Sequence, residues 1–126
     1  MGRFSDKLNH IIFKLNLKFV FEWELLKENT MNIQRRMRQA IHEQKYRISS
    51  HANEEMANDF LVAADIENII LYGKITKKFT RDPRGVRYKV CGDTLDCRRG
   101  AVVCRFLLSS DLLIITAYVE KTIKEV

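Results

Sequence analysis

The last third of the chain consists of short apolar-rich runs separated by turn-forming residues. Three of them, Arg87–Cys91, Ala101–Leu108 and Leu112–Val119, are rich in β-branched and aromatic residues and end at Gly, Ser or Asp, which predicts β-strands. A further strand is predicted over Lys74–Phe79, before the turn Arg81–Gly85, where Pro presets φ and Gly supplies a positive φ. Because such short connections make neighbouring strands antiparallel, the pattern predicts a four-stranded antiparallel meander in chain order.

The first half of the chain has the apolar spacing of helices. The helices are predicted near residues 32–46, 50–58 and 63–72. Ser49 and Ser50 offer an N-cap for the second helix, and Gly73 stands at the C′ position of the third, where a glycine with positive φ often ends a helix. Phe60 and Leu61 break the helical period and are expected to fill the core.

The order of these elements, helices first and strands afterwards, indicates the α+β class. We expect the N-terminal helices to pack on one face of the four-stranded antiparallel β-meander, within a single α+β domain over residues 31–126. Residues 1–30 are interpreted as an N-terminal extension. Helical spacing in its first half and strand alternation in its second leave both a helix and a strand open there.

Charge is the compositional feature that bears on function. The chain has a net charge of +6, and residues 74–105 alone carry ten Lys or Arg against three Asp or Glu. A basic region of this kind suggests an anionic partner, of which nucleic acid is the commonest, although a solvated basic surface is the alternative. No run approaches the roughly 18 apolar residues of a membrane span, and nothing resembles a cleaved signal. We therefore expect a cytoplasmic protein that does not enter a membrane.

The predicted strands place cations and a tyrosine on the polar face of the sheet. Alternation puts Arg87 in phase with Lys89 on one strand, and Tyr118 ends the last strand. Cations beside an aromatic hydroxyl suit the binding of a phosphodiester and the stabilisation of its developing charge. Sequence does not fix the register between strands, so a solvated sheet face stays the alternative. The cations expected to bind RNA are Lys89, Arg98, Arg99 and Arg105.

His51 is the candidate acid or base, since it follows two serines at a predicted helix start and an imidazole exchanges protons near pH 7. The alternative is a histidine that caps the helix or packs against the sheet. Cys91, Cys97 and Cys104 lack the spacing of a compact zinc knuckle and form no disulfide framework, so we expect no metal. Cys97, in the turn before Gly100, is expected to be exposed.

Three motifs between Asn32 and Val119 carry a resemblance to a known family. They are a Ser-x-His-Ala signature at Ser49–Ala52, an Arg-Tyr…Gly…Asp run at Arg87–Asp96, and an Ile-Ile-Thr-x-Tyr strand at Ile114–Tyr118. With these motifs in this order, the chain resembles a bacterial family named domain of unknown function 4258.

The resemblance implies a layout similar to the RelE and barnase group of ribonuclease toxins, small basic α+β proteins that cleave RNA without a metal ion. By that analogy the catalytic residues are His51, Arg87 and Tyr118. This assignment rests on similarity of fold alone. The chain departs from the family pattern at Cys97, where a glycine is expected. It also has Ala101-Val102 where many relatives have a histidine, which removes a second catalytic imidazole.

The leading hypothesis is a small cytoplasmic protein acting on RNA, a metal-independent ribonuclease toxin of a toxin–antitoxin pair, with an antitoxin protein as partner and no cofactor. His51 would act as acid or base, Arg87 and Lys89 would hold the phosphate, and Tyr118 would stack on a base or donate a proton. The alternative is a non-catalytic domain that binds a protein partner or nucleic acid through the same face. A third hypothesis is an oligomer formed through residues 1–30.

Overall fold

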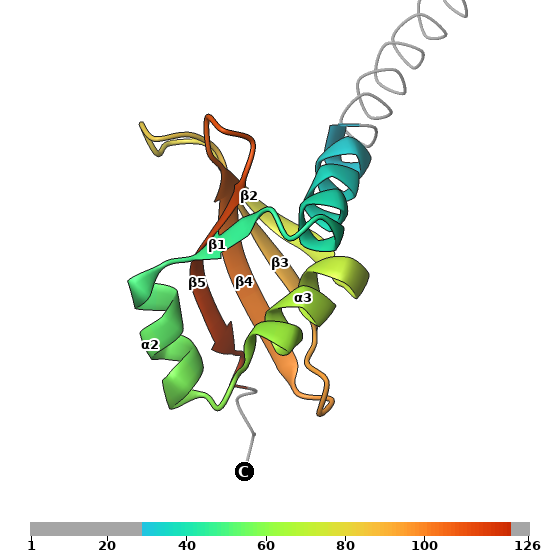
Figure 1. Cartoon of the computed structure of the whole chain (residues 1–126), viewed down its shortest axis with the longest axis vertical. Helices are drawn as coiled ribbons and strands as arrows, with labels where there is room; N and C mark the ends of the chain where they lie inside the picture. The colour runs from blue at the N-terminus through green and yellow to red at the C-terminus, as the bar shows by residue number, and fades with distance from the viewer. Residues whose placement is uncertain (1–28, 122–126) are drawn as a thin grey trace, which may run out of the picture. The chain divides into compact units, whose positions relative to one another are not determined.

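Five strands form one mixed sheet in the computed structural model, which describes residues 29–121 (Figure 1). The strands are β1 (Tyr46–Ile48), β2 (Lys74–Phe79), β3 (Arg87–Asp93), β4 (Arg99–Phe106) and β5 (Leu112–Val119). Their order in the sheet is β1-β5-β4-β3-β2. Strands β2 to β5 are antiparallel neighbours, whereas β1 pairs with β5 in parallel. Gln34–Val126 forms a unit separate from Met1–Ile33, and nearly all of the predicted extension lies outside the described residues.

The α+β class is confirmed, but the predicted four-stranded antiparallel sheet is wrong, because the sheet has a fifth strand and one parallel pair. The extra strand, β1, arises where the helix predicted over 32–46 ends early. The first described helix covers residues 29–42, and Gln44 then takes a left-handed conformation with φ of 57°. Lys45 N–H donates to Ala40 O at 2.8 Å, which closes the last turn. A strand of three residues is too short to show an alternating pattern.

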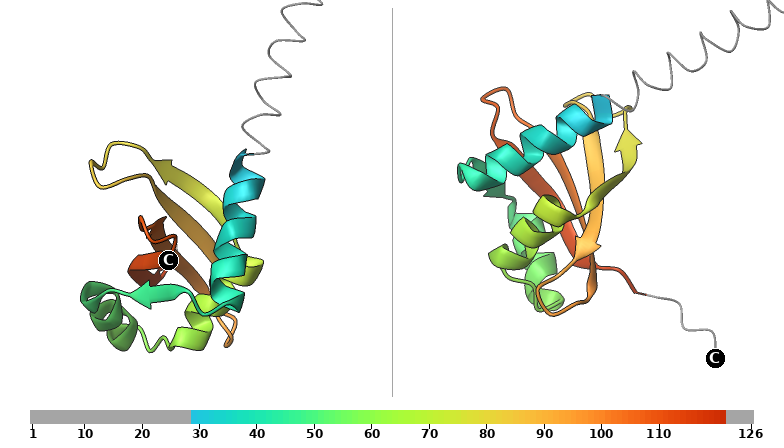
Figure 2. Two further views of the ribbon diagram at one scale, coloured as in Figure 1. Left: turned by 45° about the horizontal axis from the view of Figure 1, so that its top comes forward. Right: turned by 90° about the vertical axis from the view of Figure 1, so that its right-hand side faces the viewer.

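Two helices cover one face of the sheet, and a third lies at its edge. The helix ending at residue 42 and α3 (Ala63–Tyr72) lie over the same face in both views of Figure 2. Their apolar side chains meet the inward-facing residues of the strands. The largest fully buried side chains are those of Met37, Ile41, Ile66, Ile69, Val90, Val102, Cys104, Leu112 and Ile114. The opposite face of the sheet carries no helix among the described residues.

Two residues between the helices and the sheet differ from their predicted roles. Gly73 does follow α3, but its φ is −82° rather than positive. A Cβ there would lie 2.3 Å from Ile69 O and 2.5 Å from Cys91 O, so the close approach of α3 to β3 is what requires glycine. Leu61 is buried as predicted, whereas Phe60 is 84% exposed, because a φ of 56° turns its side chain outward.

The remaining helix, α2 (Ser50–Asn58), lies between the other two in the chain and covers the edge of β5 beyond the end of β1. Ser49 is the N-cap, as predicted: its Oγ accepts from Ala52 N–H at 3.0 Å and donates to Ile115 O at 3.0 Å. At the other end, Asp59 Oδ2 accepts from Val119 N–H at 2.8 Å. These contacts satisfy edge groups of β5 and fix the start of α2, and with it His51, beside the middle of that strand.

Candidate functional site

The face of the sheet without helices carries the polar side chains, as alternation predicted. The register aligns Lys89 with Val103 and Thr116, and Arg105 with Leu113, across β3, β4 and β5. A bulge after Val103 shifts β5 by one residue relative to β4. We call this side of the sheet the open face.

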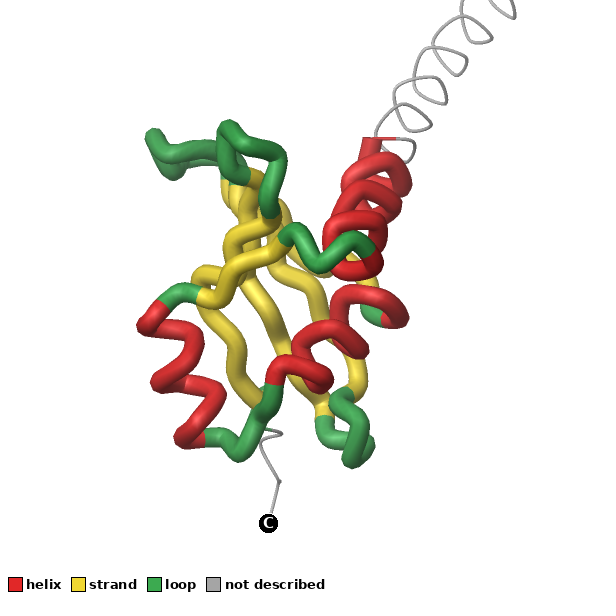
Figure 3. The backbone as a smooth tube through the Cα atoms, viewed as in Figure 1, coloured by secondary structure: helices red, strands yellow, loops and turns green. Residues whose placement is uncertain are grey.

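One cavity at an end of the open face contains His51 and two of the predicted arginines. The 80–86 and 107–111 loops lie at the same end of the sheet (Figure 3). The cavity has a volume of about 270 Å³ and takes Asp82 and Arg84 from the first of these loops. The residues that line this His51 cavity are Ser49, His51, Asp82, Arg84, Arg87, Arg105, Leu113 and Ile115. Apolar side chains from β5 and cations from the neighbouring strands and loop therefore line the same space.

Asp82 organises the cations of the His51 cavity. Its Oδ1 accepts from the backbone N–H of Arg84 at 2.9 Å and lies 3.5 Å from Arg84 Nε, while its Oδ2 lies 3.3 Å from Arg87 Nε. The hydrogen bond from Arg84 N–H, with the charges of Arg84 and Arg87, holds the pKa of the Asp82 carboxyl below its ordinary value. Asp82 is therefore ionised at neutral pH and fixes the loop over the sheet. Three arginines and one carboxylate leave the cavity with an excess of positive charge.

The guanidinium groups of Arg87 and Arg105 retain unused donors. The Nε atoms of both are buried, and neither makes a hydrogen bond within residues 29–121. The 3.3 Å approach of Arg87 Nε to Asp82 is an ion pair whose angle is too poor for a hydrogen bond. Arg105 Nη1 donates to Arg84 O at 3.0 Å, which holds its guanidinium in place. Buried donors without acceptors are rare. Here both belong to guanidinium groups, whose charge attracts anionic oxygens.

His51 is exposed at the rim of the cavity and has an acidic neighbour on its own helix. Its Nε2 lies 3.1 Å from Oε1 of Glu55, one helical turn later, and its side chain is 65% exposed. Oε1 of Glu55 is buried and makes no hydrogen bond among the described residues, so the approach of His51 is an electrostatic contact that does not fix which ring nitrogen carries the proton.

Tyr118 and Lys89 lie on the open face but outside the residues that line the His51 cavity. Lys89 Nζ is 3.0 Å from Glu120 Oε1 and 5.9 Å from the centroid of the Tyr118 ring. Hydrogen bonding to Glu120 is the main cause that raises the pKa of Lys89 above its ordinary value, and hydrogen bonding to Tyr118 is the second. Cys91 Sγ also donates to Glu120 Oε1, at 3.4 Å. The structure thus separates Tyr118 from the two residues it was predicted to act with.

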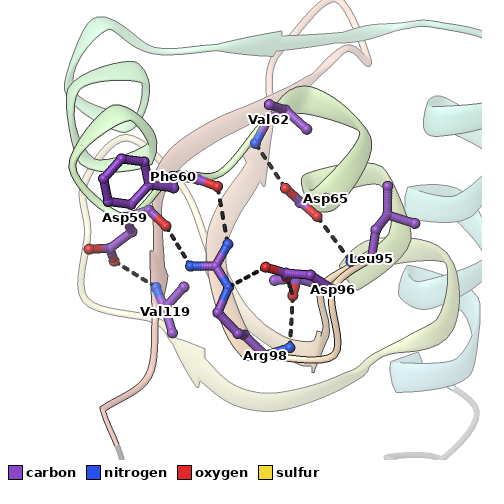
Figure 4. Close-up of polar contacts among 9 residues, drawn as sticks. Asp59, Phe60, Val62, Asp65, Leu95, Asp96, Arg98 and Val119 are labelled. Carbon is purple, nitrogen blue, oxygen red and sulfur yellow. Dashed lines mark hydrogen bonds and ion pairs between the residues drawn. The ribbon is translucent and has the colours of Figure 1, made fainter.

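Arg98 lies in the β3–β4 turn, and Arg99 is the first residue of β4. Consecutive antiparallel strands are joined at alternate ends of the sheet, so this turn is at the opposite end from the 80–86 loop and the His51 cavity. Arg98 uses three nitrogens on contacts within the protein (Figure 4): Nε lies 2.7 Å from Asp96 Oδ2, Nη1 donates to Asp59 O at 2.6 Å, and Nη2 donates to Phe60 O at 3.1 Å. It therefore ties the turn to the loop after α2. Arg99 is exposed, 3.7 Å from Asp93.

The cysteines are free thiols, of which Cys97 is exposed, as predicted, and Cys91 and Cys104 are buried. Burial raises the pKa of the Cys104 thiol to about 12. Within residues 29–121, no three His, Cys, Asp or Glu side chains gather closely enough to hold a metal ion. In the same part of the chain, no helix has the length and apolar character that crossing a membrane requires.

Two larger cavities adjoin the His51 cavity and share Arg84 with it. One, of about 640 Å³, runs along the end of β2 and the 80–86 loop. The other, of about 720 Å³, lies between Arg47 and the 107–111 loop and also includes Arg105. In the first, the Phe79 ring has Arg87 Cζ 5.1 Å from its centroid and a lysine Nζ at 4.9 Å. The three cavities together form a basic surface that is continuous at Arg84.

Sequence reasoning missed several residues of this surface. It assigned Asp82 and Arg84 to a turn and gave no role to Glu55 or Phe79. A usable signal was present: Asp82 followed two residues later by Arg84 is typical of a turn closed by the aspartate side chain, and such a turn presents its arginine at a fixed position. Glu55 stands four residues after His51, the spacing that brings helical side chains together.

A comparison with protein families supports the interpretation of the motifs. The family model described as Domain of unknown function (DUF4258) matches residues 48–119. The chain belongs to this family. The DUF4258 region runs from the end of β1 through β5 and includes His51, Arg87 and Tyr118, whereas the first described helix precedes it. No curated protein and no solved structure matches the chain. The similarity to RelE and barnase stays a prediction.

Proposed function

We propose that this DUF4258 protein binds single-stranded RNA across the open face and cleaves it at the His51 cavity without a metal ion, as a ribonuclease toxin would. The observation that carries the proposal is the composition of that cavity. It combines an exposed imidazole with three arginines, and two of the guanidinium groups have buried donors without acceptors. Guanidinium groups bind the oxygens of a phosphodiester, so the arginines of this cavity suit that group.

The cavity contains a base and charge-stabilising cations for cleavage by transesterification, and water serves as the acid. The unprotonated ring nitrogen of neutral His51 takes the proton of a ribose 2′-hydroxyl, and the resulting oxygen attacks the adjacent phosphorus. The P–O5′ bond breaks, and the departing 5′ oxygen takes a proton from water. The products are a 2′,3′-cyclic phosphate and a 5′-hydroxyl. Arg87 and Arg105 stabilise the negative charge that develops on the non-bridging oxygens.

The neighbouring cavities provide for the nucleotides on either side. Their cations hold the backbone, and Phe79 offers a ring for base stacking where Tyr118 was predicted to serve. Aromatic rings and basic grooves in combination are typical of single-strand binding without strict sequence preference. Lys89 and Tyr118 extend the same face beyond the cavity.

The test is an assay of the purified full chain on a 5′-labelled single-stranded RNA in the presence of EDTA. We expect fragments ending in a 2′,3′-cyclic phosphate. His51→Gln should lower the rate about 100-fold or more, the usual effect of losing a general base. Arg87→Gln should cost about 100- to 1,000-fold, as loss of an oxyanion-stabilising donor does.

The matched control is His42→Gln, since His42 is also an exposed helical histidine and lies outside the cavity. It should leave the rate unchanged, and neither histidine change should alter the unfolding midpoint by much. Cleavage that survives His51→Gln, or falls equally with His42→Gln, would refute the catalytic role. Loss of stability in His51→Gln would indicate a structural histidine instead.

A second candidate function, RNA binding without cleavage, has one observation in its favour. Among the residues lining the His51 cavity, His51 is the only side chain that ordinarily exchanges a proton near pH 7, so no second acid stands ready for the leaving group. Under this function the full chain binds RNA with log affinity falling about 0.7 per phosphate contact against log salt, and no fragment appears.

A further inference from the structure

The longest uncovered edge of the described sheet is the outer side of β2. In the strand order β2 is terminal and pairs with β3 on one side only. At the other edge, the short strand β1 and then α2 cover β5. An edge strand directs the N–H and C=O groups of alternate residues away from the sheet, where they are ready to pair with a further strand.

The side chains of this edge have one sign of charge. Within β2, Lys74, Lys77 and Lys78 are all exposed, and the strand contains no acidic residue. Lysines on an edge oppose pairing with an identical strand, because like charges then face each other. A second copy of this chain is therefore a poor occupant. A strand with acidic side chains is a good one, because every lysine then gains an opposite charge.

We propose that β2 is a docking edge for an acidic extended segment of a partner protein, which adds to the sheet as a further strand. Backbone hydrogen bonds provide the pairing, and the lysines select acidic sequences. The same edge borders the proposed RNA surface, since Lys77 and Lys78 also line the cavity around Phe79. A docked acidic segment would shield these cations from RNA. The docking itself does not depend on whether the protein cleaves RNA.

The test measures binding of a fluorescein-labelled peptide of eight residues, alternating Glu and Val, to the full chain. A second peptide has the same sequence with alternate amides N-methylated, so it keeps the charges but lacks the N–H donors that pairing requires. We expect saturable binding of the first peptide and at least about tenfold weaker binding of the second, since two or more backbone hydrogen bonds are lost. Hydrogen exchange should slow at residues 74–79 when the first peptide is bound.

Variants of the chain test the role of the lysines. The triple change Lys74→Gln, Lys77→Gln and Lys78→Gln should weaken the first peptide between about twofold and thirtyfold, because two opposite-charge cross-strand pairs are lost: Lys74 and Lys77 share one face of the sheet, and the glutamates of the peptide also share one face. Lys45→Gln is the matched control: Lys45 is exposed and precedes β1, at the opposite edge of the sheet. It should not change the affinity.

Several results would overturn the docking edge. Equal binding of both peptides would show charge attraction without strand pairing, and an absence of binding at low salt would remove the site. Slow exchange, before any peptide is added, at the alternate amides of residues 74–79 that do not pair with β3 would show that the edge is already held, by another segment of the chain or, if the free chain sediments as a dimer, by a second copy. Cleavage of RNA, or its absence, bears on none of these results.

Discussion

Replacement of Asp65 by alanine should destabilise the protein by several kcal/mol, although the residue lies far from the His51 cavity. Asp65 is 5% exposed and is the third residue of α3. Its Oδ2 accepts from Val62 N–H at 2.9 Å, which closes the start of the helix, and its Oδ1 accepts from Leu95 N–H at 2.9 Å, which ties the β3–β4 turn to that helix (Figure 4). One carboxylate therefore joins two segments that lie about thirty residues apart.

The magnitude follows from these two hydrogen bonds. A hydrogen bond to a charged group contributes about 1.5–3 kcal/mol, so two would give about 3–6 kcal/mol. Val62 is 59% exposed and Leu95 is 60% exposed, so water recovers part of this loss when the carboxylate is removed. We expect Asp65→Ala to lower the free energy of unfolding by about 2–4 kcal/mol, which for a domain of this size shifts the midpoint temperature by about 10–30 °C.

Urea unfolding followed by circular dichroism measures this effect, with a lower midpoint and an unchanged slope expected. Asp93→Ala is the matched control, because it removes the same charge from a side chain that is 70% exposed and 3.7 Å from Arg99. A surface pair of this kind contributes about 0–1 kcal/mol. Equal midpoints for Asp65→Ala and Asp93→Ala would refute the role assigned to Asp65.

Two further predictions concern the sheet. Gly73→Ala should cost at least the 1–3 kcal/mol typical of overpacking, because the new Cβ meets the backbone oxygens of Ile69 and Cys91, which cannot rotate away; a urea midpoint equal to wild type would contradict this. The hydrogen bond from Lys89 is the main cause of the lowered pKa of Glu120. The stability from this pair is therefore present above the ordinary glutamate pKa and is lost as pH falls through the lowered value. Glu120→Gln should flatten the loss of stability between about pH 5 and 3; an unchanged acid limb would show that the pair contributes nothing.

The sequence by itself determined the features that depend on neighbours along the chain. The apolar runs of the last third predicted β3 to β5, and the short turns between them predicted that neighbours are antiparallel. Ser49 was predicted as a cap because its side chain reaches an N–H three residues later. Gly85 was expected to have a positive φ, and its φ is 128°. The family signature around His51 is also local.

Tertiary structure decided what depends on residues distant in the chain. Tyr46–Ile48 is a strand because it pairs in parallel with β5. A segment of three residues is too short for its sequence pattern to predict a strand. Glycine is required at position 73 because α3 and β3 approach too closely there for a Cβ atom, and not because the backbone has a positive φ. The register, a bulge and the cap contact of Ser49 with Ile115 bring His51 beside Arg87 and Arg105, and leave Tyr118 elsewhere on the face. Register is a property of paired strands, so the residues of a single strand do not contain it.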